Sequence, residues 1–186
     1  RISFIDLPYS NPEKLKEILS VHKFKCIFHF AGLTKAKRNE DFERVNYKFT
    51  KNLVDAIDVN QTKLIYLSSF AAHGPGDEKT FAKAKVSDDN KPNTAYGVSK
   101  LKSEEYINAN FKGKYVILRP TGVYGPRETD YFVFFQTIKN HLEPYLGFVP
   151  QHLTFVYSKD LVDVCIKAFE SEISGKTYFV SDGNMY

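Results

Sequence analysis

The stretch "KLIYLS", residues 63–68, is a short and mostly apolar run with a polar residue at each end. A continuous apolar run of this length is typical of a strand that is buried on both faces of a parallel sheet. Four further runs of this kind predict strands, namely "RISFI" at 1–5, "KCIFHF" at 25–30, "KYVILR" at 114–119 and "KTYFVS" at 176–181. The sheet is therefore built from segments that lie far apart in the sequence.

Helical segments separate these strands. The first is predicted to open at "SNPE", residues 10–13, which has the form of a capping box with Pro12 near the first turn. The next, over roughly residues 39–58, carries apolar side chains at helical spacing on one face. These side chains are Phe42, Val45, Phe49, Leu53 and Ala56. Further helices are predicted at 94–110, within 130–142, and at 158–170.

The alternation of strands and helices predicts an α/β fold, in which helices cover both faces of a doubly wound parallel sheet. The 186 residues are enough for one domain with a core of its own. In such sheets the ligand binds beyond the carboxyl ends of the strands. The polar segments that follow the strands, "HFAGLTK" from 29, "SSFAAHG" from 68 and "RPTGVYGPR" from 119, are therefore the candidate site.

The composition bears on the class of partner. The formal net charge is +4, but the positive residues are scattered. The densest cluster, "KAKR" at 35–38, precedes a helix rich in acidic residues and is typical of a solvated face, so we expect no nucleic-acid partner. The longest apolar runs are far too short to span a membrane, so we expect no membrane partner.

The two cysteines, Cys26 and Cys165, both lie in apolar runs. We interpret them as small core residues rather than as a disulfide or a metal-binding pair. The sequence has no CxxC or HExxH spacing, so no metal site is expected. A reducing, cytoplasmic compartment fits this cysteine usage.

The segment "TAYGVSK", residues 94–100, places Tyr96 and Lys100 on one face of a predicted helix. A nearby ammonium lowers the pKa of a phenol by roughly 1 to 3 units, which would let Tyr96 exchange a proton near neutral pH. Ser69, at a neighbouring strand end, would hold the substrate oxygen. A lone YxxxK is more often a surface pair, and Ser68 and Ser69 are equally suited to cap a helix or loop. Their combination favours a site.

Seven segments carry a pattern that one family combines in this order. They are "DL" at 6–7, "HFAG" at 29–32, "VNYKFTKNLVDA" at 45–56, "LSS" at 67–69, "YGVSK" at 96–100, "LRPTGVYGPR" at 118–127 and "FVYSKDLV" at 155–162. With them the sequence resembles the extended short-chain dehydrogenase/reductase family, which includes nucleotide-sugar epimerases and dehydratases. The resemblance implies a Rossmann-like fold, NAD or NADP as cofactor, and a small-molecule substrate such as a nucleotide sugar.

The resemblance also implies roles for individual residues. Ser69, Tyr96 and Lys100 would be catalytic, with Tyr96 as the acid/base and Lys100 both lowering its pKa and bonding the nicotinamide ribose. Tyr96 and Lys100 would also bind the cofactor. The other cofactor-binding residues would be Asp6, Leu7, Phe30, Ala31, Gly32, Asn46, Pro120 and Thr121.

Within that set, Asp6 and Leu7 would flank the adenine, and Gly32 would let the backbone approach the cofactor closely. Pro120 and Thr121 would border the nicotinamide and the substrate. A capping or core hydrogen bond is an equally plain role for Asn46.

The family's glycine-rich turn does not occur, because none of the ten glycines forms GxGxxG. By the family pattern "RISFI" is the third strand, so we expect an incomplete Rossmann-like sheet whose first two strands lie outside residues 1–186. We expect residues 1–5 to pair non-natively, to swap between chains or to borrow other strands, and these 186 residues to bind cofactor weakly or not at all. A single partial domain over residues 1–186 is expected, with residues 120–157 contributing to a substrate-side lobe.

Three functions stay open from the sequence. The first is an NAD(P)-dependent epimerase or dehydratase of a nucleotide sugar. Leu153, where such enzymes usually carry arginine, and Thr121, where they often carry asparagine, favour instead a reductase of a ketone or aldehyde, resembling hydroxysteroid or flavonoid reductases. The third is a non-catalytic cofactor-sensing module, a class that tends to lose the serine or tyrosine present here. Family members often form homodimers through the helices around 39–58 and 94–110, so a homodimer is a further expectation.

Overall fold

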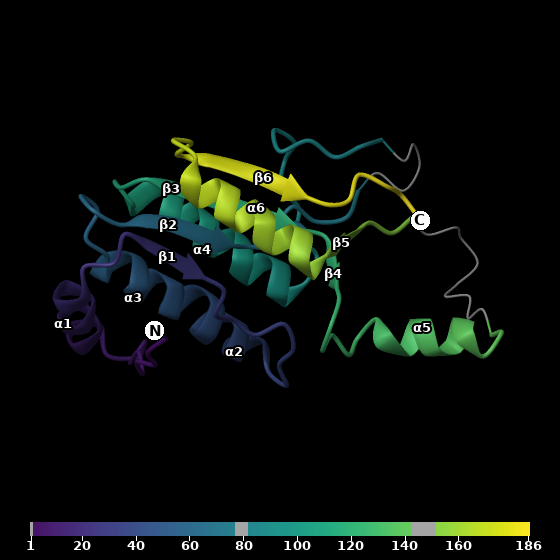
Figure 1. The fold of residues 1–186 in the computed structure, drawn as a ribbon, viewed down its shortest axis with the longest axis horizontal. Coiled ribbons are helices and arrows are strands. Elements are labelled where there is room, and N and C mark those ends of the chain that lie inside the picture. The colour runs from purple at the N-terminus through teal and green to yellow at the C-terminus, as the bar shows by residue number, and fades with distance from the viewer. Residues whose placement is uncertain (1, 77–81, 143–151) are drawn as a thin grey trace.

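The structure is a computed structural model that describes residues 2–76, 82–142 and 152–186. At its centre is a parallel sheet of four strands (Figure 1). Their order across the sheet is β1 (Cys26–His29), β2 (Lys63–Leu67), β3 (Tyr115–Pro120) and β6 (Lys176–Val180). The predicted α/β fold with a parallel sheet is confirmed; β1, β2 and β6 lie within predicted apolar runs, and β3 ends one residue beyond its run.

Helices cover both faces of this sheet (Figure 1). On one face lie α1 (Pro12–His22), α3 (Phe49–Ala56) and α4 (Ala95–Asn110), and on the other lies α6 (Ser158–Glu170). Side chains alternate accordingly along a single strand, as the two-residue period of a strand requires. In β2, Leu64 and Tyr66 pack with the first three helices, whereas Ile65 packs with α6.

The predicted helix over residues 39–58 is one helical segment that ends at Ala56 and changes its winding in the middle. It begins as α2 (Asn39–Phe42), continues as the π-helical segment η1 (Glu43–Lys48), and ends as α3. A π-helical turn is rare and often marks a functional site. Here it carries Asn46, which is buried.

The strand predicted over residues 1–5 is wrong. Residues 2–5 lie in no strand, and the side chains of Ile2 and Phe4 are 85% and 97% exposed. A strand needs a partner for its backbone hydrogen bonds. In the part of the chain that the structure describes, β1 is an edge strand that pairs with β2 alone, and residues 2–5 do not pair with its open edge.

The first helix begins close to the predicted position but with a different cap. Asn11 is the N-cap residue, and its side chain accepts a hydrogen bond from the Lys14 backbone N–H at 3.1 Å. The expected capping box, which would start at Ser10, is therefore wrong. Pro12 explains the shift, because its fixed φ suits the first helical position and the residue before it adopts an extended conformation.

Two smaller elements follow β3. The strands β4 (Gly122–Tyr124) and β5 (Phe155–Tyr157) form a short parallel pair that the sequence did not predict. The helix α5 (Phe132–Lys139), shorter than the predicted 130–142, stands away from the sheet and has no buried residue (Figure 1). None of the helices among the described residues is long and apolar enough to cross a membrane.

Lys63 joins the start of β2 to the end of α6. It is 7% exposed, and its ammonium donates hydrogen bonds to the carbonyl oxygens of Ala168 at 2.6 Å and Ser171 at 2.5 Å. Helix C-termini leave carbonyl groups without a partner and carry a partial negative charge. The Lys63 ammonium donates to these carbonyl groups and balances their partial negative charge, so it fixes α6 against the sheet.

Gly97 allows α4 to approach the short 3₁₀ helix η2 (Phe70–Ala72) closely. A Cβ atom at Gly97 would lie 2.2 Å from the carbonyl oxygen of Ala71 and 3.1 Å from the side chain of Pro92. Because the first atom belongs to the backbone, neither helix can yield without moving as a whole. This contact places the first turn of α4 beside the end of β2.

We predict that Gly97→Ala lowers the free energy of unfolding by about 1–3 kcal/mol, the usual cost of overpacking. Urea denaturation of the variant and the parent chain measures this. Gly76→Ala is the matched control, because a Cβ atom there would meet nothing within 4 Å. Equal stability of the Gly97 variant and the parent would contradict the close approach.

Candidate functional site

The carboxyl ends of β1 and β2 bring three of the residues predicted from the sequence together. A Cβ atom at Gly32, in the segment after β1, would lie 3.0 Å from Oδ1 of Asn46 and 3.4 Å from Nζ of Lys100. The backbone of Gly32 therefore lies directly against an amide from the π-helical turn and an ammonium from α4. A larger residue would separate these groups.

Asn46 holds this arrangement in place. Its Oδ1 accepts a hydrogen bond from the Leu33 N–H at 2.7 Å, and its Nδ2 donates to the Leu33 carbonyl at 3.0 Å and to Oγ of Ser99 at 3.0 Å. Its own carbonyl oxygen accepts from the hydroxyls of Thr50 at 2.6 Å and Ser103 at 2.9 Å. The core hydrogen-bonding role considered for Asn46 is thus present, and it ties the segment after β1 to α4.

Lys100 is a buried cation, 5% exposed. Its Nζ donates to the Leu67 carbonyl at the end of β2, at 2.9 Å, and lies 5.0 Å from the centre of the Tyr66 ring. Burial lowers the pKa of Lys100 to about 8, and the carboxylate of Glu104 opposes that effect. An ammonium has three donors, so donors remain beyond the one directed to Leu67 among the residues that the structure describes.

Tyr96 and Ser69 form the adjacent part of the site. The hydroxyl of Ser69 acts to lower the pKa of the Tyr96 phenol, and the ring of Phe42 packs 6.0 Å from that of Tyr96. Ser69 is also the N-cap of η2, where its Oγ accepts from the Ala71 N–H at 3.1 Å. Both interpretations of Ser69, as a partner of the tyrosine and as a cap, hold at once.

The pKa of Tyr96 differs from the sequence-based expectation. Burial raises the pKa of this phenol, and the Ser69 hydrogen bond only partly offsets that effect. The expected lowering of its pKa by Lys100 is wrong for this structure. The reason is that removing a phenolate from water costs more free energy than its interactions with neighbouring groups provide.

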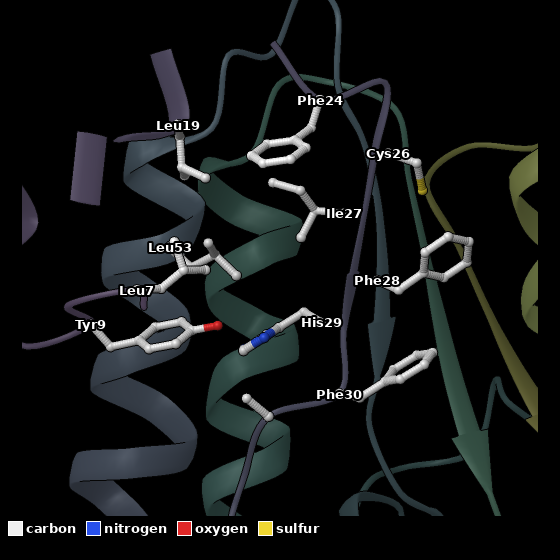
Figure 2. A pocket seen from close by; sticks show the side chains of 11 residues that line it. Leu7, Tyr9, Leu19, Phe24, Cys26, Ile27, Phe28, His29, Phe30 and Leu53 are labelled. Carbon is white, nitrogen blue, oxygen red and sulfur yellow. The ribbon is translucent and has the colours of Figure 1, made fainter. Parts of the chain in front are cut away.

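A groove of about 300 Å³ lies beside β1 and collects three further predicted residues (Figure 2). Leu7, Phe30 and Ala31 line it, and Figure 2 shows Leu7 on the same side of β1 as His29 and Phe30 on the other. Asp6, next to Leu7, is exposed. The lining is mostly apolar, so the groove suits a flat or apolar group better than a charged one.

Pro120 and Thr121 lie at the carboxyl end of β3, one strand beyond Ser69. The backbone N–H of Thr121 donates to the Val180 carbonyl at 3.0 Å, which joins this segment to the end of β6. The predicted residues thus occupy the same edge of the sheet over three neighbouring strands. Among the described residues there is no group of three or more His, Cys, Asp or Glu side chains that could hold a metal ion.

Sequence reasoning missed two polar clusters under the site. One joins Glu104 to Arg119, and the other joins His29 of β1 to Thr50 of α3. Glu104 offered a signal, because it lies four residues after Lys100 and therefore on the same helix face. His29 offered none, since a histidine inside an apolar strand shows no spacing pattern.

His29 is held as a neutral ring. It is 3% exposed, its Nε2 lies 2.8 Å from Oγ1 of Thr50, and its ring stacks with those of Tyr9 and Tyr66. Burial, aided by the charge of Lys100, lowers the pKa of His29 to about 3. Its usual value is about 6.5, so the unfolded chain binds a proton that the folded chain refuses over the range between the two pKa values.

We predict that this histidine makes the fold sensitive to acid. The unfolded state binds more protons between about pH 6.5 and pH 3, so the free energy of unfolding falls as the pH falls, by roughly 1.4 kcal/mol per pH unit from this residue. In His29→Gln that contribution to the slope should vanish, as measured by urea denaturation at a series of pH values. His22→Gln, at an exposed position of α1, is the control and should keep the parent's slope. The same slope in parent and His29 variant would refute the assignment.

The comparison with known proteins agrees with this site. The chain matches the model of the NAD dependent epimerase/dehydratase family over residues 1–181, and it belongs to that family. It therefore carries the family's fold and belongs to a family of NAD-dependent enzymes.

Individual relatives show what the chain is similar to. It is 27% identical to the solved structure of ADP-L-glycero-D-manno-heptose-6-epimerase from Helicobacter pylori, with a TM-score of 0.79 over 97% of this chain and 60% of that one. The Bordetella bronchiseptica enzyme WbmG, solved with NAD and UDP, has a TM-score of 0.81 at 17% identity, over 99% of this chain and 59% of that one. That second likeness shows the fold alone.

A third relative has a different chemistry. Ceramide reductase from Caulobacter vibrioides is 30% identical over 112 residues, which are 60% of this chain and 30% of that protein. The chain spans between 30% and 52% of the length of the curated relatives that it matches.

Proposed function

We propose that residues 1–186 carry the proton-transfer groups of an NAD(P)-dependent epimerase or dehydratase that acts on a nucleotide sugar. The observation that carries this proposal is the meeting of Gly32, Asn46 and Lys100 at the strand ends, with Tyr96 one turn before Lys100 on α4. Membership of the family and the likeness to a heptose epimerase support it.

Gly32 fits a dinucleotide that lies against the strand ends. The space that a Cβ atom would occupy there is bounded by Asn46 and Lys100 and stays open because the residue is glycine. The free donors of Lys100 would bond the ribose of the cofactor, and Leu7, Phe30 and Ala31 would border the groove beside β1. A bound nicotinamide would supply the hydride acceptor and donor for the sugar.

Tyr96 would move the proton. Its raised pKa keeps the phenol protonated at neutral pH, so the resting residue is a proton donor toward a carbonyl oxygen. To remove a proton from a substrate hydroxyl, Tyr96 must be the deprotonated phenolate, which a nearby positive charge stabilises. Lys100 supplies a fixed charge below it on the same helix, and Ser69 would hold the substrate oxygen within reach of the phenol.

We predict that Tyr96→Phe lowers kcat by about 100-fold or more, the usual contribution of a positioned acid/base. The assay follows conversion of nucleotide sugars by NMR or mass spectrometry, with NAD and NADP supplied separately. It uses both the protein as its gene encodes it and the 186-residue chain. Tyr106→Phe, near the other end of the same helix, is the control and should keep the parent rate.

The same variant separates catalysis from cofactor sensing. If Tyr96→Phe binds NADH as tightly as the parent, judged by a fluorescence titration, and no sugar is converted by either, the module is a sensor and the proposed activity is refuted. Loss of turnover with retained binding supports the proposal.

A reductase of a ketone or aldehyde is the second candidate. Leu153 favours it, since its side chain is exposed and cannot bond a diphosphate as arginine does, and the likeness to ceramide reductase supports it. The two activities differ in cofactor use. Stoichiometric oxidation of added NADPH would establish a reductase, whereas interconversion of sugars without net cofactor consumption would establish an epimerase.

A further inference from the structure

Beneath the site lies a buried ion pair, Glu104 with Arg119, whose side chains are 2% and 4% exposed. Nη2 of Arg119 lies 2.6 Å from Oε2 of Glu104, and Nε lies 3.0 Å from Oε1. The hydroxyl of Ser68 also donates to Oε1 of Glu104. Nη1 of Arg119 donates to Oδ1 of Asn90 at 2.9 Å. The carboxylate is therefore fixed from two sides.

A buried ion pair is weak support for stability, because removing both charges from water costs about as much as their attraction returns. Its place in the fold suggests another purpose. Ser68 directly precedes Ser69 at the end of β2, and Arg119 directly precedes Pro120 at the end of β3. Glu104 belongs to α4, one turn beyond Lys100. One carboxylate thus joins three segments that carry predicted site residues.

Glu104 also acts on Lys100 through its charge. It is the group whose electrostatic effect raises the pKa of Lys100, against the effect of burial. The other ionisable groups near Lys100 do not compensate its charge in the same way. His29 on β1 is neutral at pH 7, and Tyr66 on β2 stays a neutral phenol because burial raises its pKa.

Tyr96, one turn before Lys100 on α4, is likewise neutral at pH 7, since burial raises its pKa. Arg119, from β3, is a cation but is engaged by Glu104 itself. Among the described residues, the acidic group that acts on the charge of Lys100 is therefore Glu104, four residues further along α4.

We propose that Glu104 is a positioning residue of the site: fixed by Arg119 and Ser68, its carboxylate joins the ends of β2 and β3 to α4 and, one helical turn beyond Lys100, supplies the negative charge that acts on the lysine ammonium. The inference rests on the proposed function only for the role that Lys100 has in turnover. It assigns control of the charge on Lys100 to a residue that lies beneath the site and is engaged by Arg119 and Ser68.

The test is the titration of Lys100 in the 186-residue chain, followed by NMR of ¹³C-labelled lysine and assigned with Lys100→Arg. In Glu104→Gln the pKa of Lys100 should fall below its parent value of about 8, by roughly 1 unit, since a carboxylate of the same size and place is replaced by a neutral amide. Glu105→Gln removes the same charge from an exposed position of the same helix and should leave the titration of Lys100 unchanged.

Glu104→Gln leaves Arg119 buried without its partner, so this variant risks unfolding. The double variant Glu104→Gln with Arg119→Met leaves no unpaired buried charge, but it removes a cation as well as the carboxylate, so it is compared with Arg119→Met alone. A lower pKa of Lys100 in the double variant than in Arg119→Met supports the proposal, because only the carboxylate differs between them. An equal pKa of Lys100 in these two variants, or a parent-like pKa in folded Glu104→Gln, overturns it.

This measurement is independent of turnover. If the parent protein converts no substrate while Lys100 titrates as described, the proposed function fails and the role of Glu104 stands. In an active protein, Glu104→Gln should move the alkaline limb of the kcat/KM profile to lower pH by the same amount as the pKa of Lys100. An unmoved limb, with Lys100 shifted, would show that the charge of the lysine does not limit the reaction.

Discussion

The amide of Asn46 is the contact on which the rest of the site depends. Its two hydrogen bonds to Leu33 fix the segment after β1, and its bond to Ser99 fixes α4. Its carbonyl oxygen accepts from the hydroxyls of Thr50 and Ser103, which joins the π-helical turn to α3 and α4. One side chain thus links the segment that carries Gly32 to the helix that carries Lys100.

The site holds the Lys100 ammonium in largely apolar surroundings, and the carboxylate that balances its charge lies one helical turn away. Lys100 bonds a backbone carbonyl and lies over an aromatic ring, and both contacts favour a positive charge without introducing a competing one. The balancing carboxylate is set one helical turn away and shared with Arg119. Such an arrangement places the amide of Asn46 and the backbone of Gly32 beside Lys100, which suits the binding of hydroxyl groups better than of another cation.

The four strands of the sheet were predictable, because a buried parallel strand needs a continuous apolar run and each run carries that signal alone. Tyr96 and Lys100 were predictable because helical spacing places them on one face. The edge of the sheet was not, since "RISFI" has the composition of a strand and composition does not say whether a segment pairs. Nor was Arg119 beneath the site, because its partner Glu104 lies on another element. The rise in the pKa of Tyr96 depends on burial, which no spacing pattern measures.

The contacts of His29 with Thr50, Tyr9 and Tyr66 exclude a role for this residue in proton transfer. The hydroxyl hydrogen of Thr50 is donated to the Asn46 carbonyl, so Oγ1 of Thr50 faces Nε2 of His29 as an acceptor. The imidazole must therefore carry its hydrogen on Nε2 and is fixed as a single tautomer. Stacked between Tyr9 and Tyr66, the ring cannot turn over to exchange its two nitrogens. Although it lies near Lys100, His29 is a structural link between β1 and α3 and is unable to relay protons.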